Sequence, residues 1–171
     1  MKMTLFASLV TVLAFALTAS AGVIPIPKDN PVATVPFPEK WKVKVGEYSI
    51  DAVSDDDDVS IYITAHDGVT IDPAIGAASE YLTSHGVKIK KDSEIKTEAK
   101  VNGMDVLDYT WKGTDKDGDT RIGLTIYRVS TDRLLLVLFW ASPSGEKDNA
   151  KELKAIYAGI KPTAAIVVPV P

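Results

Sequence analysis

Three aspartates at alternate positions, Asp115, Asp117 and Asp119, have a spacing that could serve metal chemistry. Alternating carboxylates of this kind converge on Ca²⁺ in the EF-hand loop. The rest of that loop does not fit, because with Asp115 as position one, Thr120 stands where glycine is required and Ile126 where glutamate is required. A polar turn between two strands is therefore the favoured interpretation, with irregular, weak binding of a cation left open.

A second acidic segment, residues 55–58, places four like charges side by side. Together with Asp51 it could form a patch for a divalent cation. Ca²⁺, however, requires six to eight converging oxygens, and this run has no turn to converge them. We expect hydrated, mutually repelling carboxylates in an exposed turn, and we assign neither a metal site nor a cofactor.

The chain has two histidines, His66 and His85. His66-Asp67 could supply an oriented general base at a sheet edge, but no Gly-x-Ser-x-Gly motif and no cysteine provides a nucleophile. We expect His66 to lie in a loop, and His85, next to Gly86, to cap carbonyl groups at the end of a helix. Two isolated histidines also lack the spacing of a zinc site. No catalytic residue is assigned.

Aromatic residues are candidates for lining a ligand groove, because such grooves are mostly apolar with few polar groups. Aromatic side chains on strands belong more often to the core. Tyr109 and Trp111 are two positions apart and therefore share one face of a strand. If helices leave that face uncovered, these two residues form the candidate binding surface. The aromatic residues considered are Trp41, Tyr62, Tyr109, Trp111, Tyr127 and Trp140.

Residues 1–21 have the pattern of a signal peptide: a basic start at Lys2, an apolar stretch and the cleavage motif Ala19-Ser20-Ala21. The mature chain is expected to begin at Gly22 and to be periplasmic or secreted. No later segment has the roughly 20 apolar residues that a membrane span needs. Since the chain has no cysteine, neither a lipidated cysteine nor a disulfide can form.

The mature chain is expected to form one domain. It has a Pro-rich lead-in at residues 22–38 without strand pairing, a single domain at 39–162 and an apolar tail at 163–171. Loss of Lys2 takes the formal net charge from −4 to −5, and the basic residues are interspersed with acidic ones. This pattern argues against nucleic acid as a partner, because phosphates favour clustered Lys and Arg.

Strands are predicted where apolar and polar residues alternate. Asn102-Gly103 suits a type I′ turn, in which both residues have positive φ, so the flanking strands should form a hairpin. A polar loop is expected at residues 113–119. In chain order, the predicted strands cover residues 41–45, 48–52, 59–64, 87–90, 95–101, 104–112, 121–129 and 134–140.

Two segments have the period of a helix. The first is expected to begin with Asp72 as N-cap and Pro73 at the first helical position, and to end at Gly86. The second is expected to follow Ser142-Pro143, with the serine as cap, and to run as one helix to about Gly159.

The strand Leu134–Trp140 has seven consecutive apolar residues and no polar face. Such a strand is expected in the centre of a sheet with both faces covered. The predicted fold class is therefore α+β, with a mainly antiparallel sheet and helices packed on its faces as an α/β/α sandwich.

This order of elements resembles the PsbP-like superfamily, named after the photosystem II extrinsic subunit P, and the DcrB-like bacterial envelope proteins. The likeness spans roughly residues 35–162. It depends on Phe37-Pro38-Glu39-Lys40-Trp41, the helix ending Tyr81-Leu82-Thr83-Ser84-His85-Gly86, Val101-Asn102-Gly103, the glycines at 113 and 118, and Ile160-Lys161-Pro162.

The resemblance implies a PsbP-like fold and a class of protein that mostly binds or helps to assemble other proteins, with a minority binding metal ions. No functional signature residue carries over. DcrB-like members are often lipoproteins, and the absence of cysteine departs from that pattern.

The sequence favours an exported, non-catalytic binding or assembly module of the bacterial cell envelope that contacts another envelope or secreted protein. The alternatives are a hydrolase using scattered carboxylates and a structural protein that binds divalent cations weakly. A concave pocket with two or more converging ionisable groups would favour the enzyme.

Overall fold

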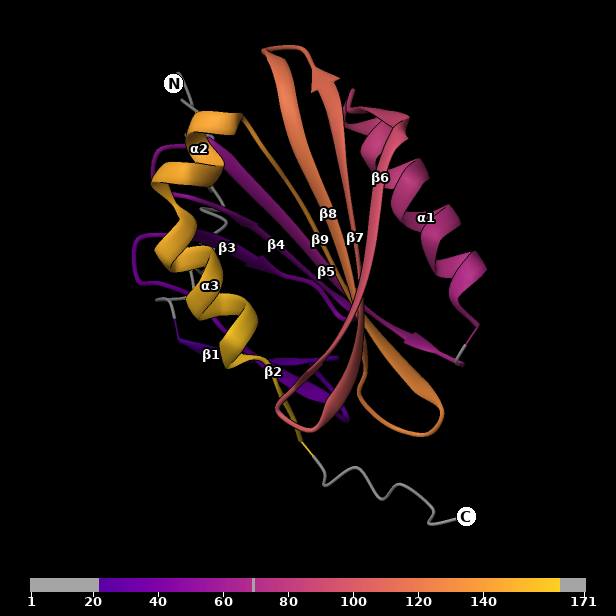
Figure 1. Ribbon diagram of the computed structural model, residues 1–171. Coiled ribbons are helices and arrows are strands. Elements are labelled where there is room, and N and C mark those ends of the chain that lie inside the picture. Colours follow the sequence, from indigo (N-terminus) through magenta and orange to yellow (C-terminus); the bar gives the residue numbers. More distant parts are fainter. Residues whose placement is uncertain (1–21, 69, 164–171) are drawn as a thin grey trace, which may run out of the picture.

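The computed structural model describes residues 22–68 and 70–163, which form an α+β fold with two antiparallel sheets (Figure 1). This fold class confirms the prediction. The larger sheet has seven strands, and every neighbouring pair in it is antiparallel. In spatial order its strands are β3 (Lys42–Val45), β4 (Ser49–Val53), β5 (Val59–Asp67), β9 (Arg133–Ala141), β8 (Gly118–Arg128), β7 (Met104–Asp115) and β6 (Lys88–Val101).

Strand β9 lies in the middle of this sheet, between β5 and β8. Leu134, Leu136 and Leu138 pack into one hydrophobic cluster, whereas Leu135 and Val137 pack into another on the opposite face. All five are at most 2% exposed. The prediction of a central strand buried on both faces is confirmed, because successive side chains of a strand point to opposite faces.

Helix α1 (Ile71–Ser84) covers one face of the sheet, and its residues Ala74, Ala78 and Leu82 are buried against that face. The predicted N-cap is wrong: the helix begins after Thr70, and Asp72 lies inside its first turn. Proline is tolerated throughout a first turn because those N–H groups have no intrahelical partner, so Pro73 does not mark the first residue.

The end of α1 confirms the prediction for His85. Its Nδ1 atom donates to the Tyr81 carbonyl oxygen at 2.8 Å, which satisfies one of the free carbonyl groups at the end of the helix. Gly86 follows with φ +76°, a conformation that favours glycine.

The opposite face carries α2 (Pro143–Asp148) and α3 (Ala150–Gly159) (Figure 1). Ser142 is the cap as predicted, since its Oγ accepts from the Gly145 N–H at 2.9 Å. The single predicted helix is nevertheless two helices. Asn149 ends α2 and begins α3. Its side-chain amide donates to the Asp56 carboxylate, in the loop between β4 and β5, at 2.9 Å.

A small sheet also packs on this face, formed by β1 (Val23–Ile26), β2 (Ala33–Pro36) and β10 (Lys161–Pro162). The expectation that residues 22–38 lack strand pairing is therefore wrong. Alternate residues of β1 and β2 are apolar and buried. Pro25 lies on the edge strand β1, which needs ladder bonds on one side only. The predicted leader and most of the predicted tail lie outside the described residues.

Two hairpins connect the strands of the other half of the large sheet, and their turns lie at opposite ends of β7 (Figure 1). Asn102 and Gly103 have φ of 50° and 81° between β6 and β7, which confirms the predicted type I′ turn. The predicted loop at 113–119 is wrong, because β7 and β8 continue to a two-residue turn at 116–117. The Asp115 carboxylate accepts the backbone N–H groups of Asp117 and Gly118 at 2.8 and 3.1 Å, and so stabilises the turn.

Candidate binding pocket

Tyr109 and Trp111 lie side by side on β7, on the face that α1 covers in part. Their rings are stacked, with centroids 5.6 Å apart and planes within 3°. Trp111 is 8% exposed and Tyr109 is half-buried, while the Lys96 ammonium group lies 5.7 Å from the Tyr109 ring centroid. The structure therefore brings the two predicted surface residues together, with the tyrosine as the more accessible of the pair.

A β-bulge in β6 stands opposite Trp111. Lys90 pairs with Lys112 and Ile95 with Thr110, so residues 91–94 occupy the space opposite a single residue of β7. The two predicted strands at 87–90 and 95–101 are thus one strand with an irregularity in it.

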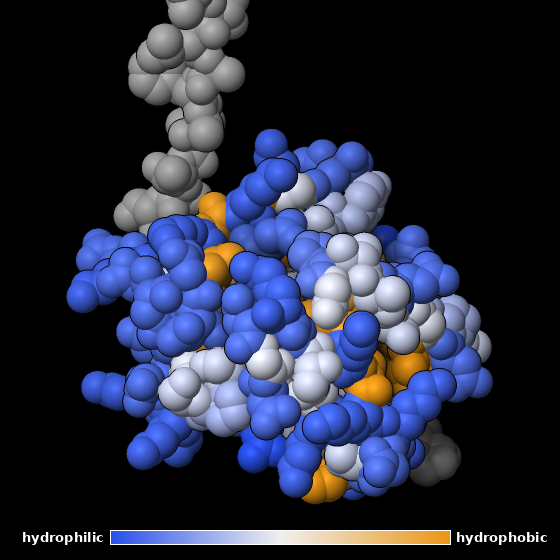
Figure 2. Space-filling model, turned by 90° about the horizontal axis from the view of Figure 1, so that it is seen from above, coloured by the Kyte–Doolittle hydropathy of each residue, from blue (hydrophilic) through white to orange (hydrophobic). Residues whose placement is uncertain are grey.

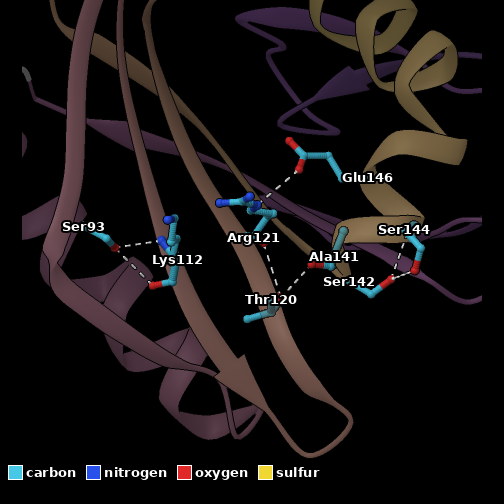
Figure 3. A network of polar contacts seen from close by, with 9 residues as sticks. Ser93, Lys112, Thr120, Arg121, Ala141, Ser142, Ser144 and Glu146 are labelled. Atoms are coloured by element: carbon cyan, nitrogen blue, oxygen red, sulfur yellow. Dashed lines mark hydrogen bonds and ion pairs between the residues drawn. The ribbon is translucent and has the colours of Figure 1, made fainter.

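Side chains hold this bulge in place. The Ser93 Oγ accepts from the Lys112 N–H at 2.9 Å, where a regular strand would supply a carbonyl oxygen (Figure 3). The Glu94 carboxylate accepts from the Trp111 indole N–H at 3.0 Å, which satisfies the only polar group of that ring. The Trp111 side chain is therefore fixed by a hydrogen bond on the side of β6 and by Tyr109 on its face.

Neighbouring polar contacts tie the same end of the sheet to α2. Figure 3 shows Arg121 of β8 directed toward Glu146 of α2, with nitrogen and oxygen 3.8 Å apart. The Thr120 hydroxyl donates to the Ala141 carbonyl oxygen at 2.8 Å, which links β8 to the end of β9. These contacts hold in place the end of the sheet at which the bulge lies.

Between α1, the start of β6 and Trp111 lies a pocket of 560 Å³, within the range of small-molecule sites. Its inner wall is apolar: Leu82, Leu124 and Leu138 are each 1% exposed. The ionisable residues among its lining are the exposed Lys88, Lys91 and Glu94. The other lining residues are Ile75, Gly76, Ala78, Ser79, Thr83, Gly86, Val87, Ile89 and Trp111.

The surface around this region has little flat apolar area. Figure 2 looks down on the end of the molecule where α1 ends and β6 begins. Hydrophobic residues there show as small areas between hydrophilic side chains. Recognition at this end would therefore use a recess bordered by polar groups.

The chemistry available in the pocket is binding of an apolar group. A glycosidase-type mechanism needs two facing carboxyl groups, and Glu94 is the one carboxylate among the residues that line this pocket. That carboxylate accepts the Trp111 indole hydrogen and lies at the exposed mouth. The charged groups thus border the entrance, and the interior is lined by apolar side chains.

His66 lies within β5 rather than in a loop, which corrects the prediction for this residue. The ring is half-buried beneath α1, and its Nε2 atom is buried without a hydrogen-bond partner among the described residues. Burial lowers the His66 pKa, opposed by the charge of Asp67. Asp67 itself pairs with Arg133 at 2.8 Å, so it does not orient the imidazole as a catalytic dyad would require.

The acidic residues 55–58 and Asp51 lie on different sides of the molecule. Asp56 bonds to Ser54 and Asn149, which lowers its pKa, whereas Asp51 accepts from the Tyr81 hydroxyl of α1 at 2.6 Å. Within residues 22–68 and 70–163, no three His, Asp or Glu side chains are grouped closely enough to hold a metal ion.

Sequence reasoning missed the bulge and the residues around it, including Lys88, Lys91 and Glu94. The available signal was the interruption between the two predicted strands at 87–90 and 95–101, because a short polar gap in an otherwise continuous strand is typical of a bulge.

No family model and no curated protein matches this sequence. Solved structures do match. LpqN of Mycobacterium tuberculosis, described as involved in cell envelope biogenesis, has a TM-score of 0.56 at 12% identity, covering 83% of this chain and 91% of its own. The cyanobacterial PsbP of Synechocystis sp. has a TM-score of 0.57 at 8% identity, with coverage of 90% and 98%.

A Bacteroides thetaiotaomicron protein has a TM-score of 0.57 at 16% identity, covering 85% of this chain, which spans only half of that one. None of the helices in the described part of the chain is long and apolar enough to cross a membrane. At these identities the likeness concerns the fold alone. The expected PsbP-like fold is therefore confirmed.

Proposed function

We propose that this protein is an exported, non-catalytic module of the bacterial cell envelope that binds another envelope or secreted protein through the surface at Tyr109 and Trp111. The observation that carries this proposal is the stacked aromatic pair, held rigid on β7 beside an open pocket. Tyrosine and tryptophan are enriched among the residues that dominate binding energy in protein interfaces.

The envelope setting has two supports. Residues 1–21 have the composition and cleavage motif of a signal peptide. A protein of the same fold, LpqN, is described as involved in cell envelope biogenesis. If the leader is removed as proposed, mass spectrometry of the exported protein will find Gly22 at the N-terminus, whereas a chain that still carries Met1 would contradict export by this route.

The binding role is tested by crosslinking in intact cells. A photo-reactive phenylalanine analogue at position 109 should give a specific adduct with an envelope or secreted protein after irradiation. The matched control places the same analogue at Lys154, an exposed position of α3 on the opposite face. The same adducts at both positions, or none from position 109, would refute the proposed surface.

A further inference from the structure

We propose that the 560 Å³ pocket behind Trp111 binds a single hydrocarbon chain that carries an anionic head group, such as a fatty-acid carboxylate. This ligand goes beyond the protein contact proposed for Tyr109, because it occupies the recess rather than the surface of the aromatic pair. The proposal does not depend on the protein partner.

The apolar inner wall of the pocket disfavours a polypeptide backbone. Every main-chain N–H and C=O group that enters a dry site needs a hydrogen-bond partner. The buried side chains of the wall, such as Leu82, Leu124 and Leu138, offer none. The hydrogen of the Thr83 hydroxyl is already donated to the Ser79 carbonyl oxygen at 2.8 Å, so this group has no donor left for a backbone carbonyl. A hydrocarbon has no such requirement and gains contact with each apolar neighbour.

The volume of the pocket excludes a single side chain as sufficient occupant. A cavity of about 150 Å³ holds one benzene molecule, so 560 Å³ has room for roughly three to four groups of that size. One apolar side chain of a partner protein would leave most of the space empty and would lose the dispersion contacts of the uncovered wall. A flexible chain of many methylene groups can fill it.

The charges at the mouth select the head group. Lys88 and Lys91 are both exposed among the lining residues, and the described ion pairs involve neither of them. Glu94, the one acidic group there, accepts the Trp111 indole hydrogen. The chain as a whole has a net charge of −4, so this local excess of positive charge favours an anionic group against the general field of the protein.

The test is calorimetric titration of the purified exported protein with two probes that share a twelve-carbon chain, dodecanoate and dodecyltrimethylammonium, each below its micelle-forming concentration. We expect saturable binding of dodecanoate at least tenfold tighter than that of the cation. In the double variant Lys88→Glu/Lys91→Glu, the preference should be lost or reversed. The control variant Lys151→Glu/Lys154→Glu, with the same charge change on α3, should keep it.

A large side chain that fills the pocket tests whether the probes bind there. Ile75→Trp, at a half-buried lining position, should weaken binding of both probes at least tenfold. If that variant does not fold by circular dichroism, Ser79→Trp at an exposed position of the rim replaces it. Failure of both probes to bind, equal affinity for the two head groups, or binding unaffected by the folded tryptophan variant would overturn the proposal. The crosslinking result at position 109 would stand in each case, because it reports a protein contact.

Discussion

The two faces of the seven-stranded sheet are covered to different extents. One face is packed by α2, α3 and the small sheet, which together bury a large cluster that includes Ile26, Val35 and Ile156. The other face is covered by α1 alone, which packs its own Ala74, Ala78 and Leu82 against the sheet. The 560 Å³ pocket opens on this second face, between the helix and the edge strand β6.

The difference leaves one face of the sheet fully packed and the other partly accessible. A single helix is about 10 Å wide, whereas neighbouring strands are spaced about 4.8 Å apart, so one helix covers only part of a seven-stranded sheet. Where helices cover the sheet completely, its apolar side chains belong to the hydrophobic core. The cover by α1 ends at β7 and β6, and apolar side chains there remain partly accessible. Tyr109 and Trp111 lie at that boundary.

The largest expected effects come from β9, which contributes to both clusters. Leu135→Ala on the fully packed face and Leu136→Ala on the α1 face should each lower the free energy of unfolding by about 2–5 kcal/mol, since each creates a cavity among buried neighbours. Denaturant melts measure both. A neutral Leu136→Ala would show that α1 does not cover β9 and would break the comparison on that side.

A smaller loss is expected from adding one methyl group to the fully packed face. A Cβ at Gly123 would stand 2.2 Å from the Phe139 ring, which itself packs edge-on against Tyr157 of α3. Gly123→Ala should therefore destabilise the protein by about 1–3 kcal/mol, as overpacking does. A melting temperature equal to that of the parent chain would mean that this face has free space.

The same change on the other face should have the opposite sign. A Cβ at Gly76, inside α1, would meet no atom within 4 Å. Gly76→Ala should raise the free energy of unfolding by about 0.5–1 kcal/mol, because alanine loses less backbone freedom on forming a helix. Parallel melts of the two glycine variants sharpen the comparison, and loss of stability at position 76 would contradict an open α1 face.

The sequence predicted the parts of the fold in which one local pattern decides. Seven apolar residues in β9 require two covered faces, Asn102-Gly103 requires a tight turn, and Ser142-Pro143 begins a helix. The prediction for residues 22–38 was wrong because the number of prolines masked the alternation of Ile24, Ile26 and Val35. The burial of these residues depends on a partner surface far along the chain.

The candidate site was predictable only in part. Tyr109 and Trp111 share a face because they are two residues apart on a strand. The pocket beside them depends on where α1 crosses the sheet and on a bulge 17 residues before Trp111 in the sequence, at Glu94. Neither follows from local periodicity, since both are set by packing between distant segments.

His66 provides the smallest expected effect and reports on how closely α1 covers its face. Burial beneath the helix lowers the pKa of the imidazole in the folded protein below its ordinary value, near 6.5 in an unfolded chain. Between the folded and unfolded pKa values the unfolded state therefore binds more protons. The stability contributed by neutral His66 is fully present above about pH 6.5 and is lost as the pH falls toward the folded pKa.

The measurement is the free energy of unfolding across pH 5 to 7, where carboxylates with ordinary or lowered pKa values, such as Asp56, stay ionised. The parent chain should lose stability as the pH falls through this range. His66→Phe should show a flatter profile than the parent chain, because the residue that gains a proton on unfolding is removed. If His66→Phe keeps the slope of the parent chain, the imidazole is solvated in the folded state. In that case α1 would lie further from β5 than it does in the structure, and the open part of this face would extend beneath the helix.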